Sequence, residues 1–138
     1  MARSSEGSED LVKIVQDLRD RVRRLELLSS VRAVSFVTQS SSASSSTFAR
    51  MAWSSFPRSG SSLTVDVSVT LSGAANCELQ LRADGTQIGA ATVTSSGTVT
   101  LQGFLPEAWV FGARKVVEVQ AKVPGGSAAI AVVGAWHQ

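Results

Sequence analysis

Residues 63–71, LTVDVSVTL, alternate strictly between aliphatic and polar side chains. Successive residues of a β-strand point to opposite faces of the sheet, so one face of this segment carries only Leu and Val. The other face carries hydroxyl groups and one carboxylate. This pattern predicts a strand in an antiparallel sheet that has one face on a hydrophobic core and the other in water.

The same alternation recurs on both sides of this segment, and the dipeptide Asp84-Gly85 is typical of a two-residue hairpin turn. The stretch AAIAVVGAW (128–136) is apolar on both faces, which favours the centre of a sandwich or a subunit contact. Short strands at this spacing predict a mainly β chain with a jelly-roll-like antiparallel β-sandwich. Besides 63–71, we expect strands at 48–56, 77–82, 87–94, 98–102, 116–123 and 128–136.

The composition is that of a folded chain with little charge. Of 138 residues, 43% are hydrophobic and 17% are charged, and the net charge is only +2, so it gives no reason to expect a nucleic-acid partner. The single cysteine, Cys77, can form neither an intrachain disulfide nor a zinc site. It alternates with Leu79 and Leu81, so we expect it to point inward as a small apolar residue.

A different period appears in residues 11–26, LVKIVQDLRDRVRRLE. Leucines fall at heptad position d and valines at position a, which predicts a coiled-coil seam that one helix cannot bury alone. Residues 21–26, RVRRLE, resemble the short trimerisation motif Arg, apolar, any, any, apolar, Glu, and the resemblance implies a homotrimer. The expected oligomerisation residues are Leu11, Val15, Leu18, Arg21, Val22, Leu25 and Glu26.

Two alternatives to the trimer stay open at this point. Heptads with Val at a and Leu at d also suit a dimer. Val12, Ile14 and Leu28 broaden the apolar stripe, as in a helix that lies on its own sheet.

These patterns divide the chain into four parts. We expect a disordered N-terminus (1–8), a coiled-coil stalk (9–30), a first strand with a serine-rich linker (31–47) and a β-sandwich head (48–138). Within the third part, 31–38 is β-branched and suits a strand, while QSSSASSST (39–47) is either a linker or a surface loop. No apolar run reaches the about 20 residues that span a bilayer, and no secretory signal is seen, which predicts synthesis in the cytoplasm without membrane insertion.

Catalytic chemistry is sparse. The only histidine, His137, is the second-last residue, where we expect neither the burial nor the orientation that a catalytic imidazole needs. No cofactor motif or metal-ligand cluster is present, so we expect a non-enzymatic protein without cofactor or metal. Trp109, in the expected loop LPEAWVFG, is the candidate contact to a ligand or neighbouring molecule, whereas Trp53 and Trp136 are expected in the core.

The whole layout resembles the small virion proteins of tailed phages, especially those of actinobacterial hosts. The resemblance rests on RVRRLE (21–26), on the glycine-rich β segment LRADGTQIGAATVTSSGTVTLQG (81–103) and on the order of helix, serine-rich spacer and sandwich. It implies a homotrimeric fibre, spike, minor tail or decoration protein on a phage capsid or tail, located in the virion. Its implied partners are copies of itself, other virion structural proteins and a host-surface glycan.

Two other functions suit the same sequence. One is a capsid cement protein that stabilises the shell, and the other is a free carbohydrate-binding β-sandwich module. The sequence leaves open whether the location is capsid or tail, which receptor or ligand is bound and which end anchors to the particle.

Overall fold

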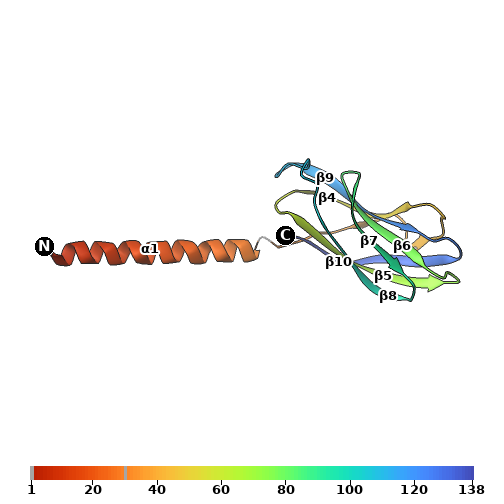
Figure 1. The fold of residues 1–138 in the computed structure, drawn as a ribbon, viewed down its shortest axis with the longest axis horizontal. Helices are drawn as coiled ribbons and strands as arrows, with labels where there is room; N and C mark the ends of the chain where they lie inside the picture. The colour runs from red at the N-terminus through yellow and green to blue at the C-terminus, as the bar shows by residue number, and fades with distance from the viewer. Residues whose placement is uncertain (1, 30) are drawn as a thin grey trace. The chain divides into compact units, whose positions relative to one another are not determined.

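A computed structural model describes the backbone of residues 2–29 and 31–138, and the side chains of residues 10–23 and 31–138. The chain forms two compact units, which divide between Val31 and Arg32. The first unit contains one helix, α1 (Ala2–Ser29). The second contains ten strands, so the expectation of a mainly β chain is confirmed (Figure 1).

Four strands are long and lie mostly in the middle of the two sheets, while the first three are only two residues each. In chain order they are β1 (Arg32–Ala33), β2 (Val37–Thr38), β3 (Ser42–Ala43), β4 (Ala49–Pro57), β5 (Ser62–Ser72), β6 (Cys77–Ala83), β7 (Thr86–Val93), β8 (Gly97–Phe104), β9 (Arg114–Lys122) and β10 (Ser127–His137).

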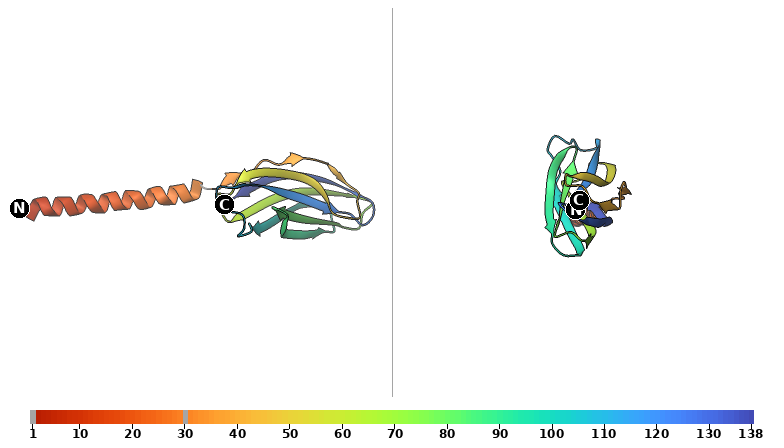
Figure 2. Two further views of the ribbon diagram at one scale, coloured as in Figure 1. Left: turned by 90° about the horizontal axis from the view of Figure 1, so that it is seen from above. Right: turned by 90° about the vertical axis from the view of Figure 1, so that its right-hand side faces the viewer.

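The strands form two antiparallel five-stranded sheets, which stack as a β-sandwich (Figure 2). Sheet A has the order β1-β10-β5-β8, with β3 also paired to β10, and sheet B has the order β2-β4-β9-β6-β7. The pairings are nested: β6 with β7, β5 with β8, β4 with β9, and β3 with β10. Such nesting, in which each outer pair encloses the next, is the arrangement of a jelly roll.

The core lies between the sheets and follows the alternation of the sequence. In β5, Leu63, Val65 and Val67 are fully buried, and β9 contributes Val117 and Val119 from the opposite sheet. Each such side chain stabilises the fold by roughly 1.5–3 kcal/mol relative to full exposure. The two inner faces therefore hold the sheets together.

The turn between β6 and β7 is formed by Asp84 and Gly85, with φ values of 49° and 80°. Positive φ at both central residues is the geometry of a type I′ turn, which twists in the same sense as the strands. The predicted hairpin turn is therefore confirmed.

Residues 31–47 differ from the sequence expectation. The segment 31–38 is not one strand, because β1 pairs with β10 in sheet A and β2 pairs with β4 in sheet B. The serine-rich stretch contains β3, whose Ala43 is buried. The chain therefore crosses between the sheets three times before β4 and covers one edge of the sandwich. Local composition could not show this, because the partners come from residues far along the chain.

The helix is longer than expected. It begins at Ala2, so residues 2–8 are helical where the sequence predicts a disordered terminus. Ala2, Arg3 and Glu6 all have favourable helix propensities, which outweigh the unfavourable Gly7. Met1 and Ser30 lie outside the described residues. Among the described residues, no helix is long and apolar enough to cross a membrane.

Cys77 is fully buried, as the alternation predicts. Burial raises the pKa of its thiol above the ordinary value of 9.0, and the adjacent Glu78 carboxylate adds to the rise. Above pH 9, the folded protein therefore retains the thiol proton of Cys77, whereas the unfolded chain releases it. The stabilisation from this group is complete below pH 9 and is lost as the pH rises above it.

Two measurements test this environment. Iodoacetamide should label the thiol slowly at about pH 8 in the native protein and rapidly in denaturant. The free energy of unfolding of the wild type should fall more steeply above pH 9 than that of Cys77→Ala. Equal labelling rates in the native and unfolded protein would contradict the buried position.

Candidate functional site

The outer face of sheet B carries several charged and amide side chains on neighbouring strands. Residues that lie directly opposite in antiparallel strands point to the same side, so the pairing register defines rows across the sheet. One row contains Trp53, Glu118 and Arg82. The next contains Arg50, Gln120 and Gln80, and a third contains Glu78 and Lys122. We call this surface the polar face.

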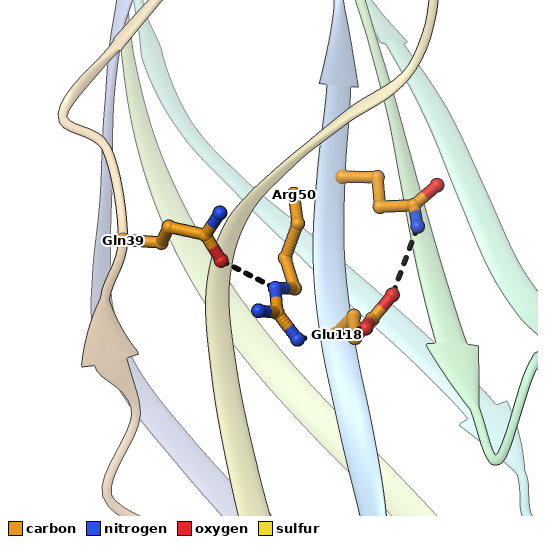
Figure 3. A network of polar contacts seen from close by, with 4 residues as sticks. Gln39, Arg50 and Glu118 are labelled. Carbon is orange, nitrogen blue, oxygen red and sulfur yellow. Dashed lines mark hydrogen bonds and ion pairs between the residues drawn. The ribbon is translucent and has the colours of Figure 1, made fainter.

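A chain of side-chain hydrogen bonds crosses the polar face (Figure 3). The Arg50 guanidinium donates to Gln39 Oε1 through Nε and to Glu118 Oε1 through Nη1, the latter at 3.2 Å. Gln120 Nε2 donates to Glu118 Oε2 at 2.9 Å, and Gln80 Nε2 donates to Gln120 Oε1. Five side chains from β4, β6, β9 and the segment after β2 are thereby held in fixed orientations.

A β-bulge positions the arginine of this network. The register shifts between Arg50 and Ala52, and the extra residue, Met51, points into the core. The Met51 carbonyl accepts hydrogen bonds from the Gln39 and Ser40 amides. Bulges commonly redirect side chains beside functional surfaces. Here the bulge brings Gln39 next to Arg50, so their contact follows from the backbone path.

Beside the network, a hollow of about 410 Å³ opens over β6 and β7. Ala90, opposite Gln80 in the register, presents only a methyl group to this face, which leaves room for the hollow. Phe48 forms one wall, and Lys122 lies over its ring at 5.2 Å while pairing with Glu78 at 2.8 Å. The other lining residues are Leu79, Gln80, Gln87 and Thr92. A cavity of this size is in the range of small-ligand sites.

The polar face contributes little to stability through its ion pairs. The Arg50 and Glu118 side chains are 40% and 26% exposed, and exposed pairs of this kind contribute roughly 0.2–1 kcal/mol. The arrangement instead presents amide donors and acceptors, a carboxylate and a guanidinium on one face of the sheet. Half-buried Trp53 and exposed Phe48 add aromatic surface. Such a set can bind a ligand rich in hydroxyl groups.

The structure corrects the expectation for Trp109. Its side chain is fully buried, and its ring packs against Phe56 at 5.3 Å between centroids. The indole Nε1 donates to the Ala113 carbonyl at 2.7 Å, which closes the loop onto the core. The residue lies in a loop as predicted, but it anchors that loop and does not contact a ligand. The large apolar area of an indole favours burial, even when the residue lies in a loop.

The other two tryptophans also differ from expectation. Trp53 lies on the polar face, beside Glu118 in the register, and Trp136 is 37% exposed on the outer face of sheet A opposite Thr64. The alternation of each strand decides their orientation, because their neighbours Ser54 and His137 take the inward positions.

His137 is buried, contrary to the expectation for this position. Its Nε2 accepts hydrogen bonds from the Ser59 and Gly60 amides at 3.0 and 2.9 Å, and its Nδ1 donates to the Ser62 carbonyl at 2.7 Å. Main-chain groups therefore occupy both ring nitrogens. The imidazole fastens the end of β10 to the loop before β5 and has no free nitrogen for acid–base catalysis.

On the helix, the described seam residues are exposed within one chain. Leu11, Val15, Leu18 and Val22 are 62%, 42%, 53% and 51% exposed. Arg21 pairs with Asp17 of the same helix at 3.2 Å. The side chains of Leu25 and Glu26 lie outside the described residues. The coiled coil stays a prediction. Among the side chains that the structure describes, no group of three His, Cys, Asp or Glu is placed to hold a metal ion.

Comparison with protein-family models and with curated proteins finds no match. Among solved structures, the chain is similar to a sugar-binding protein described as the EclA C-terminal domain, with a TM-score of 0.48 and 17% identity over 72% of this chain and 75% of that one. It is also similar to the C-terminal family 22 carbohydrate-binding module of Clostridium thermocellum Xyn10B, with a TM-score of 0.47 and 13% identity over 75% and 71%.

A third similar structure is a cyclase from Fischerella sp. TAU, with a TM-score of 0.47 and 15% identity. The match covers 75% of this chain and 62% of the cyclase. Similarity at these levels does not identify a function for this chain.

Part of the polar face could be predicted from the sequence. Glu118, Gln120, Glu78 and Gln80 stand at polar positions of alternating strands, which predicts that they face outward. Nothing local joins them to Arg50, because the register between β4 and β9 and the bulge at Met51 are set by the fold.

Proposed function

We propose that this chain is a non-enzymatic binding protein whose sandwich binds carbohydrate through the polar face. The observation that carries the proposal is the hydrogen-bonded network of Arg50, Glu118, Gln120 and Gln80 beside the hollow walled by Phe48. Because both nitrogens of His137 are engaged by the main chain, no described imidazole is available for acid–base chemistry. Binding therefore suits these groups better than turnover.

The chemistry of the polar face matches a sugar. Amide groups both donate and accept hydrogen bonds, as sugar hydroxyls do, and a carboxylate accepts from two hydroxyls at once. An aromatic ring can pack against the apolar face of a pyranose. Because the network already orients its members, little side-chain entropy is lost when a ligand binds.

Substitutions on the polar face test this proposal. We expect a glycan array to identify at least one ligand of the intact protein, and Phe48→Ala and Trp53→Ala each to weaken that binding about three- to tenfold through lost aromatic contact. Trp136→Ala is the matched control, because it removes an exposed indole from the other sheet. Absence of any glycan ligand, or equal loss with the control, would refute the proposal.

We further propose that the helix joins three copies of the chain. One described face of α1 carries Leu11, Val15, Leu18 and Val22 at heptad spacing, and all four are exposed within one chain. Association of helices would remove this apolar surface from water. The motif of Arg21, Val22, Leu25 and Glu26 favours three strands over two. Three joined sandwiches would raise weak sugar contacts to a useful avidity.

The oligomeric state is measured by light scattering coupled to size-exclusion chromatography. The wild type should have the mass of three chains, and Leu18→Asp/Val22→Asp should have that of one, because each charge would be buried in the seam. Lys13→Asp changes the net charge by the same amount at heptad position f, away from the seam, and should stay trimeric. A monomeric wild type, or dissociation of the control, would overturn the trimer.

We also propose a location for this trimer, on the surface of a tailed-phage virion as a fibre, spike or decoration of capsid or tail. The support is the order of a short heptad helix followed by a jelly-roll-like sandwich, which suits a protein that is attached at one part and displays another. Its partners would be other virion proteins and a host-surface glycan. A capsid cement role is the alternative for the same location.

Mass spectrometry of purified particles tests the location, and gold labelling separates capsid from tail. We expect the protein at multiples of three per particle. Particles that lose shell stability but keep host adsorption when the protein is deleted would favour cement over attachment. Absence from particles would exclude both roles while leaving the glycan binding intact.

A further inference from the structure

A second cavity, of about 510 Å³, lies at the edge of the sandwich where β1 of sheet A faces β4 of sheet B. It shares no lining residue with the hollow of the polar face. One part of its wall is apolar, formed by Val34, Phe56 and Pro57. The rest includes serine residues, Ala33, Gly112, the imidazole of His137 and two arginines, Arg32 and Arg58.

Arg58 is unusual because its charge is buried. The residue is 8% exposed, and its guanidinium is held by main-chain carbonyls: Nε donates to Gly60 at 2.8 Å, and Nη1 donates to Pro106 at 2.9 Å and to Trp109 at 2.7 Å. The ring of Phe111 lies 4.4 Å from the guanidinium carbon. These contacts fix the orientation of the guanidinium plane.

One nitrogen of this guanidinium has no protein partner. Within the part of the chain whose side chains are described, Nη2 of Arg58 makes neither a hydrogen bond nor an ion pair. The only fully buried side-chain polar atom without a partner in that part is Asn76 Oδ1, so Nη2 reaches solvent. Arg58 lines the cavity, and Nη2 is the guanidinium nitrogen that its main-chain contacts leave unengaged.

The charge of the cavity has one sign. Its lining contains two arginines and no aspartate or glutamate, and Arg114 donates to the carbonyl of the lining residue Ser55 at 2.8 Å. A buried cation normally has an anionic partner, because removing a charge from water without one is costly. The carbonyl groups supply partial negative charge only. An anion in the cavity would supply the full negative charge that these carbonyl groups lack.

We propose that this cavity binds a small ligand with an oxyanion head group, a carboxylate or a phosphate, on a compact apolar body. The head group would accept hydrogen bonds from Nη2 of Arg58 and lie near the charge of Arg32, since a guanidinium suits oxyanions. The apolar body would lie against Val34, Phe56 and Pro57. This site is independent of the polar face and of the helix.

Titration of the full-length protein with benzoate, followed by calorimetry or by chemical-shift changes, tests the site. We expect saturable binding of one benzoate per chain with a dissociation constant of about 1 mM or below. Benzamide, which has the same shape without the charge, should not bind. Inorganic phosphate is the second probe, and tighter binding of phosphate than of benzoate would identify the head group as phosphate.

Variants separate the ligand from the structural role of Arg58. Arg32→Gln should weaken benzoate binding about threefold or more. Arg32 is exposed, and its side chain forms no hydrogen bond or ion pair with the other described side chains that the substitution would break. Ser35→Glu places a carboxylate at the lining and should abolish binding by competing for the guanidinium. Ser95→Glu adds the same charge in a turn outside the cavity and should bind as the wild type does.

Arg58→Lys keeps the positive charge but loses the planar guanidinium with its fixed hydrogen-bond donors, so the affinity for benzoate should fall about tenfold. Thermal melting checks that this variant is folded. Three results would overturn the proposal: equal binding of benzamide and benzoate, unchanged affinity in both Arg32→Gln and Ser35→Glu, or no saturable binding of benzoate and of phosphate. None of these results bears on glycan binding, because the two sites share no residue.

Discussion

The packing of two aliphatic faces against each other is the constraint on which the rest of this structure depends. Strand β5 places Leu63, Val65 and Val67 in the core. Strand β9 of the other sheet contributes Val117 and Val119. Because strand side chains alternate, an inward aliphatic residue forces its neighbours outward. The polar face is thus a consequence of the core. A slip of one residue in β9 would bury Glu118 and Gln120 and expose the valines.

The strength of this alternation explains how much of the fold could be predicted. Strands β5, β6 and β9 stand out because each alternates between aliphatic and polar residues. Asp84 and Gly85 identify the hairpin turn, because both adopt positive φ. The short strands β1, β2 and β3 could not be found in the same way, since two residues have no period. Their positions depend on hydrogen bonds to other strands: β1 and β3 pair with β10, and β2 pairs with β4. These partner residues are not adjacent in the sequence, so local composition does not reveal them.

The candidate sites were less predictable than the fold, for two physical reasons. The polarity of Glu118 and Gln120 is visible in the sequence, but their neighbours depend on the register and on the bulge at Met51. For Trp109 and His137, the residue type alone does not show whether the side chain binds a ligand or stabilises the fold. Packing in the folded structure decides between these roles. Both are buried and bonded to main-chain carbonyl or amide groups, so they stabilise loops.

The alternation of β1, β2, β3 and β4 between the two sheets has a mechanical consequence. Tension applied through the chain before Arg32 enters the sandwich at β1, which pairs with β10 through only Arg32 and Ala33. The next attachments, β2 and β3, are equally short. They would detach one after another, and each release would lengthen the chain and dissipate work. The next strand along the chain is the nine-residue β4, whose longer ladder with β9 would take up the load after these three had yielded.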